Sequence, residues 1–513
     1  MRPTNAPLTR RSLLGLLGGG AVALLATACG AGAPTAEPAK PTAEPTAPPK
    51  PAAAAPTNTP AAAAAAKPTE AGAPKPAEPT KPAAEAKPQP ATPTPFVPPK
   101  RPTAAPGQTV VTFWYHWGSV IGEGMEAVSR AYEQANPKVK VNSLSIGSNS
   151  IAKVLTALAA GEPPDTFNNY EVQALAIRGA TIQLDDLVRG SQVVKKENYY
   201  DAVWAGGQWD GKQYAVPAFE NGAEMGLIWN KDLYKAAGLD PEKPPKTFEE
   251  LQENHKKVTK LDAAGNLDVL GYDPMDTTGG WLENWANQMG VEWHDLKSNK
   301  IKLTQDELLW AMDYIAGYYK EIGPTKFGAF RKDFGTWGTL IPAGAFAKRK
   351  QAMLVDGYWA AGGTTKIMPD ANLGVTWVPT RPNGRRIQRL GQHYAPITKD
   401  SKVRDETWKF IEFVASEPGL QTLFDVGGVL VFNKPFLKKV NTGQYRDKGL
   451  DWYVQSVSEA EAVRSKIYSP VKGEAETRWA KAVEEVYFGR KSAKDAAAEV
   501  EKQVQTALDE LLH

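Results

Sequence analysis

One long stretch of the chain cannot fold by itself, and it limits how much sequence is left for structure. From Gly30 to about Pro106 the residues are mainly Pro, Ala, Thr, Lys and Glu, and the five residues from Pro34 recur from Pro41. This composition buries too little apolar surface to offset the ordering of the chain, and proline favours extended polyproline II stretches. We interpret residues 29–107 as a semi-stiff disordered tether that could reach about 200 Å.

The residues before the tether have the pattern of an export signal. Arg10 and Arg11 stand just before an apolar run, residues 13–28, that is too short to span a bilayer as a stable helix. We interpret residues 1–28 as a signal peptide. The paired arginines are typical of twin-arginine export, and an ordinary secretory signal is the alternative.

The only cysteine of the chain, Cys29, lies at the end of the apolar run. Small residues before a lone cysteine resemble a bacterial lipobox, in which the thiol is acylated and the chain is cleaved before it. Ala26 departs from that pattern, because leucine is usual there. We predict lipidation of Cys29 and attachment to the outer face of the cell membrane, since several acyl chains give firm anchoring.

The net charge argues against a nucleic-acid partner. The formal charge is +3, and Arg2, Arg10 and Arg11 account for all of it, so the chain without its signal is formally neutral. No basic surplus remains to attract a phosphate backbone or an anionic membrane. We therefore expect membrane contact through the lipid anchor only, and about 400 residues remain for folding, enough for two lobes.

The folded part opens with alternating strands and helices. Residues 110–115 are β-branched and aromatic, which is typical of a strand. Met125, Val128 and Tyr132 then recur at helical spacing, and a second strand begins at Val139. This alternation predicts an α/β fold with a parallel sheet and helices on its faces.

Short sequence patterns in the rest of the chain indicate a turn and several helices. Asp210-Gly211 is typical of a hairpin turn, and Thr247 with Glu250 forms a capping box at the start of a helix. Residues 402–414 have the pattern of an amphipathic helix, and we expect the last helix to begin at Ser492.

Two glycine motifs resemble nucleotide sites, and we reject both. Residues 122–127 match G-x-G-x-x-A, but the next strand ends without an acidic residue to hold a ribose. Residues 206–212 match G-x-x-x-x-G-K, but Gln213 stands where a magnesium-binding hydroxyl is required, and a strand follows in place of a helix. We therefore expect no nucleotide cofactor.

Motifs for metal binding or nucleophilic catalysis are also missing from the sequence. The five histidines have no pair at metal-ligand spacing, and there is no G-x-S-x-G motif. We expect no metal, no cofactor and no enzymatic activity. A carboxylate pair for glycoside hydrolysis stays open, because such pairs meet only in the fold.

The number and placement of the tryptophans favour a sugar-binding function. The chain has 15 tryptophans, and many stand beside glycine or polar residues, such as Trp117, Trp281 and Trp337. An aromatic face contacts the apolar face of a sugar ring, while Asp, Glu, Asn and Gln bind its hydroxyls. For any single tryptophan, core or interface packing is the better interpretation, and we expect Trp408, on an amphipathic helix, to lie in the core.

Seven segments, in order along the chain, have the patterns of one known family: residues 159–165, 211–217, 226–233, 237–239, 245–251, 351–359 and 408–414. Together they resemble the extracellular solute-binding proteins of family 1, the receptors of ABC importers, to which the maltose-binding protein is related. The resemblance runs from about Val110 to the C-terminus.

The resemblance implies a two-lobed periplasmic-binding-protein fold of type II, in which each lobe is a mixed sheet flanked by helices. Residues 108–513 would form the two lobes, the first from about 108–219 and 394–431, the second from about 224–390 and 435–513. Crossover strands near residues 219–224, 391–395 and 431–435 would join them. The lobes would close on a solute by hinge motion, and the protein would act as a monomer with ABC permease subunits as partners.

The resemblance also indicates ligand-binding residues where its motifs align. They would come from the loop after the Pro-Pro-Asp turn, from the first two crossings and from the aromatic loops; the candidates are Trp117, Asn168, Asn169, Tyr170, Glu171, Glu220, Asn221, Glu224, Trp281, Asp356, Tyr358, Trp359, Gln392 and His393. Trp359 matches a stacking position of sugar binders, whereas residues 392–397 depart from the usual pattern.

We expect the cargo to be a mono- or oligosaccharide, and three alternatives stay open. Glu171, Glu220 and Glu224 would suit a polyamine, and a phosphate ester would need cationic groups converging on the cleft. An anchored enzyme acting on glycans is a third possibility. A receptor that serves a sensor kinase in place of a transporter is not distinguished by sequence.

Overall fold

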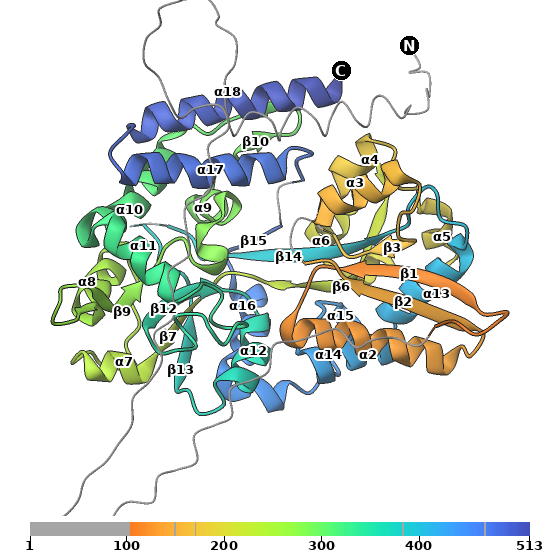
Figure 1. Ribbon diagram of the computed structural model, residues 1–513, viewed down its shortest axis with the longest axis horizontal. Coiled ribbons are helices and arrows are strands. Elements are labelled where there is room, and N and C mark those ends of the chain that lie inside the picture. Colours follow the sequence, from red (N-terminus) through yellow and green to blue (C-terminus); the bar gives the residue numbers. More distant parts are fainter. Residues whose placement is uncertain (1–102, 148–149, 170, 382–383, 466–467) are drawn as a thin grey trace, which may run out of the picture. The chain divides into compact units, whose positions relative to one another are not determined.

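The computed structural model describes residues 103–513, apart from 148–149, 170, 382–383 and 466–467. The predicted signal, Cys29, the tether up to residue 102 and the candidate Tyr170 therefore lie outside the described residues. The described part mixes helices with several sheets, so the predicted α/β class is confirmed (Figure 1).

A three-stranded parallel sheet opens the fold. The strand β1 (Thr109–Tyr115) pairs along its length with β2 (Val139–Ser145) and, near its end, with β3 (Thr166–Phe167). The helices α2 (Ser119–Ala135) and α3 (Ser150–Ala160) form the connections, as the alternation predicts. The helices that follow this sheet are short: α4 (Val172–Ile177), α5 (Asp185–Gly190) and α6 (Asp201–Ala205).

The largest sheet has five strands in the order β13-β7-β12-β9-β8. It is mixed, because β12 runs parallel to β9 and antiparallel to β7. Its strands are β7 (Gly226–Asn230), β8 (Lys260–Leu261), β9 (Leu267–Tyr272), β12 (Gln351–Asp356) and β13 (Leu373–Thr376). The helices connected with it are α7 (Lys231–Ala236), α8 (Phe248–Val258), α9 (Leu282–Met289), α10 (Asp306–Ile322), α11 (Pro324–Asp333) and α12 (Trp359–Ile367).

Two long strands connect these groups of elements. The strands β6 (Ala215–Ala223) and β14 (Ile387–Pro396) are antiparallel, and all of their residues are buried. Figure 1 shows them running from the elements around β1 to the elements around β12. A third strand, β15 (Ala462–Ser465), lies parallel to β14. Two small hairpins complete the strands: β4 (Gln208–Trp209) with β5 (Lys212–Gln213), and β10 (His294–Asp295) with β11 (Lys300–Ile301).

The last third of the chain is mainly helical. Its helices are α13 (Arg404–Ala415), α14 (Glu417–Gly427), α15 (Lys434–Leu437), α16 (Leu450–Glu459), α17 (Lys472–Tyr487) and α18 (Ala493–Leu512). The predicted cap of the last helix is confirmed, since the Ser492 side chain accepts a hydrogen bond from the Asp495 amide. The helix expected at residues 402–414 is α13, and its Trp408 is buried in the core as predicted.

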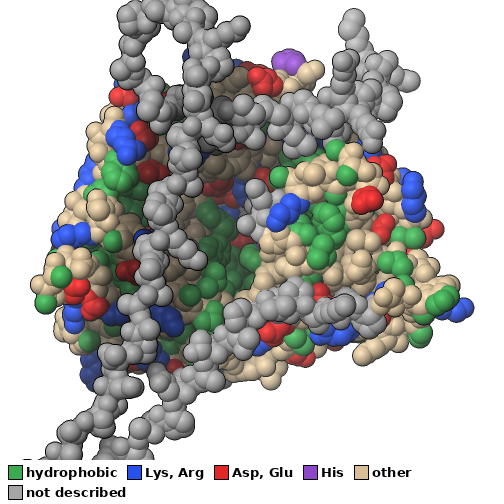
Figure 2. All heavy atoms as spheres, viewed as in Figure 1, with side chains coloured by type: hydrophobic (Ala, Val, Ile, Leu, Met, Phe, Trp, Pro, Cys, Tyr) green, Lys and Arg blue, Asp and Glu red, His purple; other side chains and the backbone are tan. Residues whose placement is uncertain are grey.

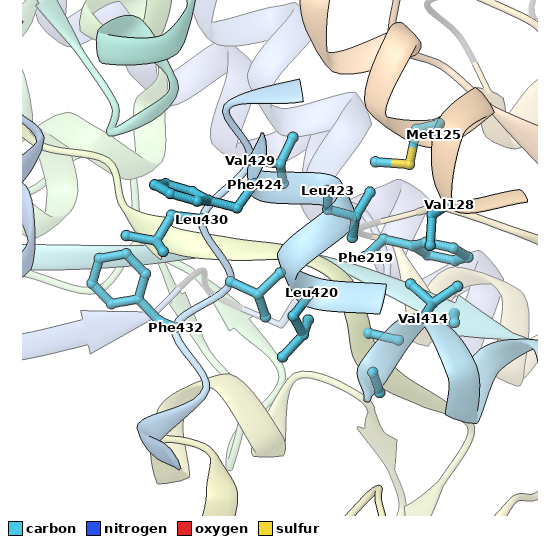
Figure 3. Packing of buried hydrophobic residues seen from close by; sticks show 14 of the residues in the cluster. Met125, Val128, Phe219, Val414, Leu420, Leu423, Phe424, Val429, Leu430 and Phe432 are labelled. Carbon is cyan, nitrogen blue, oxygen red and sulfur yellow. The ribbon is translucent and has the colours of Figure 1, made fainter. Parts of the chain in front are cut away.

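One hydrophobic cluster packs α2, α13 and α14 against β1 and the connecting strands. Figure 3 shows Leu423 of α14 on the side of Met125 and Val128 of α2, with Phe219 of β6 beside Val128, while Phe424 points toward Leu430. Gly124, from the rejected nucleotide motif, lets the helices approach, because an added Cβ would lie 2.9 Å from the Cα atom of Gly427. The glycine motif of α2 is therefore explained by helix packing.

A second large cluster is built from β9, β12 and the helices α8, α9, α10, α17 and α18. The first cluster extends beyond the predicted first lobe, because Tyr358, Tyr445 and Tyr453 belong to it. The bounds given above for the two lobes therefore remain a prediction.

Candidate functional site

The connecting strands bring four candidate residues together. Glu220 faces His393 across the ladder, and Asn221 faces Gln392. All four are at most 4% exposed. The third predicted crossing, residues 431–435, lies beside these strands, because Val431 forms a β-bridge with Asn221. The three segments expected to cross between lobes thus lie side by side.

Glu220 and His393 form a buried pair. His393 Nδ1 lies 2.9 Å from Glu220 Oε2. The Tyr358 hydroxyl also faces Glu220, and burial, followed by this carboxylate, raises the pKa of Tyr358 well above its ordinary value. Tyr358 reaches the strand because residue 222 is glycine, where an added Cβ would lie 2.5 Å from the tyrosine ring.

The loops after β1 and β3 approach the same pair. The His116 amide donates a 3.0 Å hydrogen bond to Asn168 Oδ1. The His116 ring lies 4.7 Å from that of His393, and the Trp117 ring lies 5.2 Å from it, edge to face. Strand ends of the first sheet therefore present His116, Trp117 and Asn168 to the connecting strands.

Asn169 and Glu171 contact other parts of the chain. The backbone of Asn169 exchanges two hydrogen bonds with Tyr394, at 3.0 and 2.6 Å, and its side chain accepts from the Glu171 amide. The Glu171 carboxylate faces Lys472 and the Gly473 amide at the start of α17. Burial raises the pKa of Glu171, while Lys472 opposes that shift.

A buried charge network lies at the other end of the strand pair. Arg389 of β14 forms ion pairs with Glu224 and with Glu283, the latter at 2.9 Å. Lys472 lies 2.9 Å from the same Glu283 oxygen. Glu476 accepts hydrogen bonds from the first amides of α9, and burial followed by Glu283 raises its pKa. Both cations beside the site thus face carboxylates.

Aromatic residues differ in how open they are. Trp117, Trp281 and Trp337 are half-buried. The rings of Trp281 and Trp337 are 6.2 Å apart at 49°, and the Arg389 guanidinium lies 5.2 Å from the Trp281 ring. Figure 2 shows hydrophobic side chains gathered in a hollow on the drawn face of the molecule.

Asp356 and Trp359 are as buried as the candidates on the connecting strands. The Asp356 carboxylate accepts from Thr339 and from the Gly357 amide at 2.9 Å. Trp359, at 2% exposed, belongs to the first hydrophobic cluster, and its indole nitrogen faces Asp356. Both residues support the loop that carries Tyr358.

Several buried polar atoms near the connecting strands have no hydrogen-bond partner among the described residues. They include Trp117 Nε1, Asn168 Nδ2, Asn221 Oδ1 and Gln392 Oε1. A buried polar group without a partner costs about 1–3 kcal/mol, so native structures rarely leave several in one place. Two donors and two acceptors are therefore available to a polar ligand.

Sequence reasoning missed several residues of the site. His116, Arg389 and Lys472 were not predicted, and the polar residues around Arg389 in β14, Gln388, Gln392 and His393, give no sign that the strand is buried. Trp337 was noted only as a tryptophan beside glycine. The pairing of His116 with His393 has no local signal, because the two are far apart in the sequence.

Sheets linked by paired buried strands, with polar groups and open aromatic faces beside those strands, define a binding protein for a small solute. Residues 117–421 match the bacterial extracellular solute-binding proteins, and the chain belongs to this family. It is therefore an extracellular solute-binding protein, which confirms the predicted family. The family is extracytoplasmic.

Curated relatives match over part of their length. The sn-glycerol-3-phosphate-binding periplasmic protein UgpB of Salmonella typhimurium is 28% identical over 193 residues, which are 36% of this chain and 42% of the relative. UgpB of Yersinia pestis is 25% identical over 195 residues, 36% of this chain and 41% of its own. The chain thus aligns with less than half the length of these relatives.

Solved structures match over most of the described part. CpMnBP1 with mannobiose bound has a TM-score of 0.70 at 24% identity, over 77% of this chain and 100% of its own. The maltotriose-bound MalE domain of Bdellovibrio bacteriovorus has a TM-score of 0.64 at 16% identity, over 78% and 100%. At these identities the likeness shows the fold, and the predicted periplasmic-binding-protein fold is confirmed. Within the described ranges, no helix has the length and apolar character needed to span a bilayer.

Proposed function

We propose that this receptor captures a carbohydrate between its two predicted lobes and delivers it to the permease of an ABC importer. The observation that carries the proposal is the group of unpartnered polar atoms on Trp117, Asn168, Asn221 and Gln392, close to half-buried indole faces. Sugar rings present hydroxyls that both donate and accept, together with apolar C–H faces that stack on tryptophan. The structural neighbours that bind mannobiose and maltotriose support the same class of ligand.

A phosphate ester is the second candidate, because the UgpB relatives bind glycerol 3-phosphate by name. An anionic group would need cations that are not already neutralised. Arg389 and Lys472, the cations described beside the site, each contact Glu283, and Arg389 also contacts Glu224. The charge arrangement therefore favours a neutral ligand over a phosphate ester.

A polyamine is the third candidate. Glu171, Glu220 and Glu224 surround the site, but His393 and Arg389 already face two of them. Burial raises the pKa of Glu171, which weakens its tendency to carry a charge. We propose a neutral sugar for this reason.

Isothermal titration calorimetry of the purified chain tests the cargo. The panel contains mannobiose, maltotriose, several monosaccharides, glycerol 3-phosphate and a polyamine. We expect heat of binding from at least one sugar and none from the charged compounds. Binding of glycerol 3-phosphate or the polyamine, with every sugar silent, would contradict the carbohydrate proposal.

Residues that contact the ligand are also part of the proposal. We assign hydrogen bonding to Asn168, Asn221, Gln392 and the Glu220–His393 pair, and stacking to Trp117 and Trp281. Asn221→Ala should weaken binding about tenfold, since one hydrogen bond to a buried partner is lost. Asn254→Ala, a change on α8 away from the strand pair, is the matched control.

The protein is proposed to bind without transforming its ligand. The rival is a glycan-acting enzyme that uses a carboxylate pair. Incubation with a labelled oligosaccharide separates the two, because an enzyme releases product that is lost when Glu220→Gln or Glu224→Gln is introduced. Intact oligosaccharide after prolonged incubation is expected.

Export and anchoring belong to residues outside the described part. We propose that residues 1–28 direct export, that Cys29 is lipidated on the outer face of the membrane and that residues 30–107 form the tether. The folded part would act as a monomer. Cys29→Ala should move the protein from the membrane fraction to the soluble fraction, and Ser12→Ala should leave it at the membrane.

The partner of the receptor is tested by uptake of the ligand. A sensor kinase in place of a permease would be indicated if ligand uptake persisted without the receptor.

A further inference from the structure

Two loops that follow β9 and α11 carry half-buried tryptophans. One loop contains the short 3-10 helix η2 (Thr277–Gly280) and ends at Trp281, where α9 follows. The other follows α11 and contains Trp337. Thr277 and Trp337 have positive φ angles of 51° and 59°, which non-glycine residues rarely adopt. The backbone of both loops is therefore held by surrounding contacts.

Asp276 joins the two loops. It directly precedes η2, and its Oδ1 accepts a 2.9 Å hydrogen bond from the Trp337 amide. Its own carbonyl accepts from the Gly279 amide at 3.1 Å. Asp276 is fully buried. One side chain thus fixes the backbone of one tryptophan loop to the start of the other.

Arg331 of α11 forms ion pairs with Asp273 and Asp276. Its guanidinium lies 3.7 Å from Asp276 Oδ2, and its Nε donates a 2.7 Å hydrogen bond to Asp273. Asp273 also accepts from the Tyr319 hydroxyl at 2.7 Å and from the Met275 amide at 2.8 Å. The network of Arg331, Asp273 and Asp276 is therefore anchored to α10, α11 and the sheet.

The loop that contains Trp337 also contacts the first hydrophobic cluster. Ser119, the first residue of α2, donates a 2.9 Å hydrogen bond to the Leu340 carbonyl. Trp337 packs against the hydrophobic cluster that contains α2 and the connecting strands. Trp337 therefore stands where both groups of elements meet, with Trp281 6.2 Å away.

We propose that Asp276 is a positioning residue for solute binding, which sets the spacing of Trp281 and Trp337 as adjacent aromatic walls, and that Trp337 is a further ligand-contacting residue. This inference rests on the proposed function. Asp276 touches no ligand in this scheme, because its buried carboxylate faces Trp337 N, Arg331 and Gln351. It acts through the two indole faces.

Stacking on an aromatic ring depends on distance and tilt, so a small displacement of one loop loses contact area with the sugar. The structure ties the loops with charged groups, and charge-assisted hydrogen bonds are stronger than neutral ones. Replacing the carboxylate with an amide retains an acceptor for Trp337 but removes the attraction to Arg331. The loops should then lose their fixed spacing without losing their fold.

The test compares Asp276→Asn and Trp337→Ala with the wild-type full chain, using the sugar identified by calorimetry. We expect each variant to bind about tenfold more weakly. Asp268→Asn is the matched control, because Asp268 pairs with Lys350 on the surface, 2.5 Å away, on the strand that leads to this loop. The control should bind like the wild type.

A second measurement needs no ligand. The near-ultraviolet circular dichroism of an indole depends on its surroundings. Other tryptophans also contribute, among them Trp377 and Trp452 at 5.3 Å, so the signal of the Trp281–Trp337 pair is the difference between the wild type and Trp337→Phe. Asp276→Asn should reduce this signal, while the far-ultraviolet spectrum and Asp268→Asn stay unchanged. This arm separates positioning from general loss of structure.

The outcomes are distinguishable. If the wild type binds no sugar, the proposed function fails, and the circular dichroism arm still tests positioning. If the wild type binds and Trp337→Ala binds equally well, Trp337 is not a ligand contact and the inference is overturned. If Asp276→Asn keeps both full affinity and the indole signal, Asp276 does not position the pair.

Discussion

At the scale of single residues, Gly391 is the tightest position beside the buried charge network. A Cβ added there would collide with the Glu224 carboxylate, which is ion-paired with Arg389. We predict that Gly391→Ala displaces Glu224, costs about 1–3 kcal/mol of unfolding free energy and weakens ligand binding. Urea unfolding and calorimetry measure the two effects. Gly317→Ala is the control, because it lies within α10 with nothing near its Cβ, and it should stabilise by up to about 1 kcal/mol.

Asp356 predicts a pH dependence of stability. Burial raises its pKa from 3.8 to about 7, so the folded state binds this proton more tightly than the unfolded chain. The resulting stabilisation is fully present below pH 3.8 and is lost as pH rises through about 7. The unfolding free energy of the wild type relative to Asp356→Asn should therefore fall by about 2 kcal/mol between pH 5 and pH 8.

Chemical unfolding at several pH values checks this prediction. The exposed change Asp333→Asn on α11 should leave the pH profile unaltered. A constant difference between wild type and Asp356→Asn across the range would show that the buried carboxyl does not titrate there.

The sequence predicted part of the site at this scale. Glu220, Asn221, Gln392 and His393 were named from two separate segments, and the ladder makes them direct neighbours. The resemblance predicted which segments cross between the lobes. The antiparallel pairing of β6 with β14 then brings these four residues together. Arg389 and His116 were missed because their partners, Glu283 and His393, are distant in the chain. Such pairs depend on strand register, which the local pattern does not specify.

At the scale of elements, local signals predicted the helices and turns well. Asp210 and Gly211 form the expected hairpin turn with positive φ angles of 49° and 71°. The capping box at α8 is only half as predicted. The Thr247 side chain accepts from the Glu250 amide at 3.2 Å, but the Glu250 carboxylate accepts from the Lys246 amide in place of the Thr247 amide. Which amide is used depends on the entry direction of the chain.

This cap gives a prediction that is separate from binding. Thr247→Ala removes the hydrogen bond to the Glu250 amide and should cost about 1 kcal/mol of stability. Ligand affinity should not change, because α8 packs in the second core away from the connecting strands. Thr506→Ala, in the middle of α18, is the control for loss of a threonine without loss of a cap. A large fall in affinity for Thr247→Ala would show that α8 contributes to the site.

At the scale of the whole molecule, the site draws on segments that are far apart in the chain. The segments after β1 and β3 contribute residues 116–119, 168–169 and 171, and the loops after β9 and α11 contribute residues 277–281 and 334–340. The α/β class was predictable from the alternation of strands and helices. Which residues belong to each hydrophobic cluster was not predictable. Tyr445 and Tyr453 join the first cluster although no local pattern links them to β1 or α2.

If a solute binds between these groups of elements, it should protect all four segments together. We predict that hydrogen exchange of the full chain slows at residues 116–119, 168–171, 277–281 and 334–340 when the sugar is added, because ligand binding selects the state in which both groups are engaged. Mass spectrometry of peptic peptides measures the change, and α18 should exchange at the same rate with and without ligand. Gly391→Ala, with its displaced Glu224, should show little protection at the same sugar concentration. Protection of the first two segments alone would mean that the ligand occupies one side only, and the tryptophan loops would then have no part in its capture.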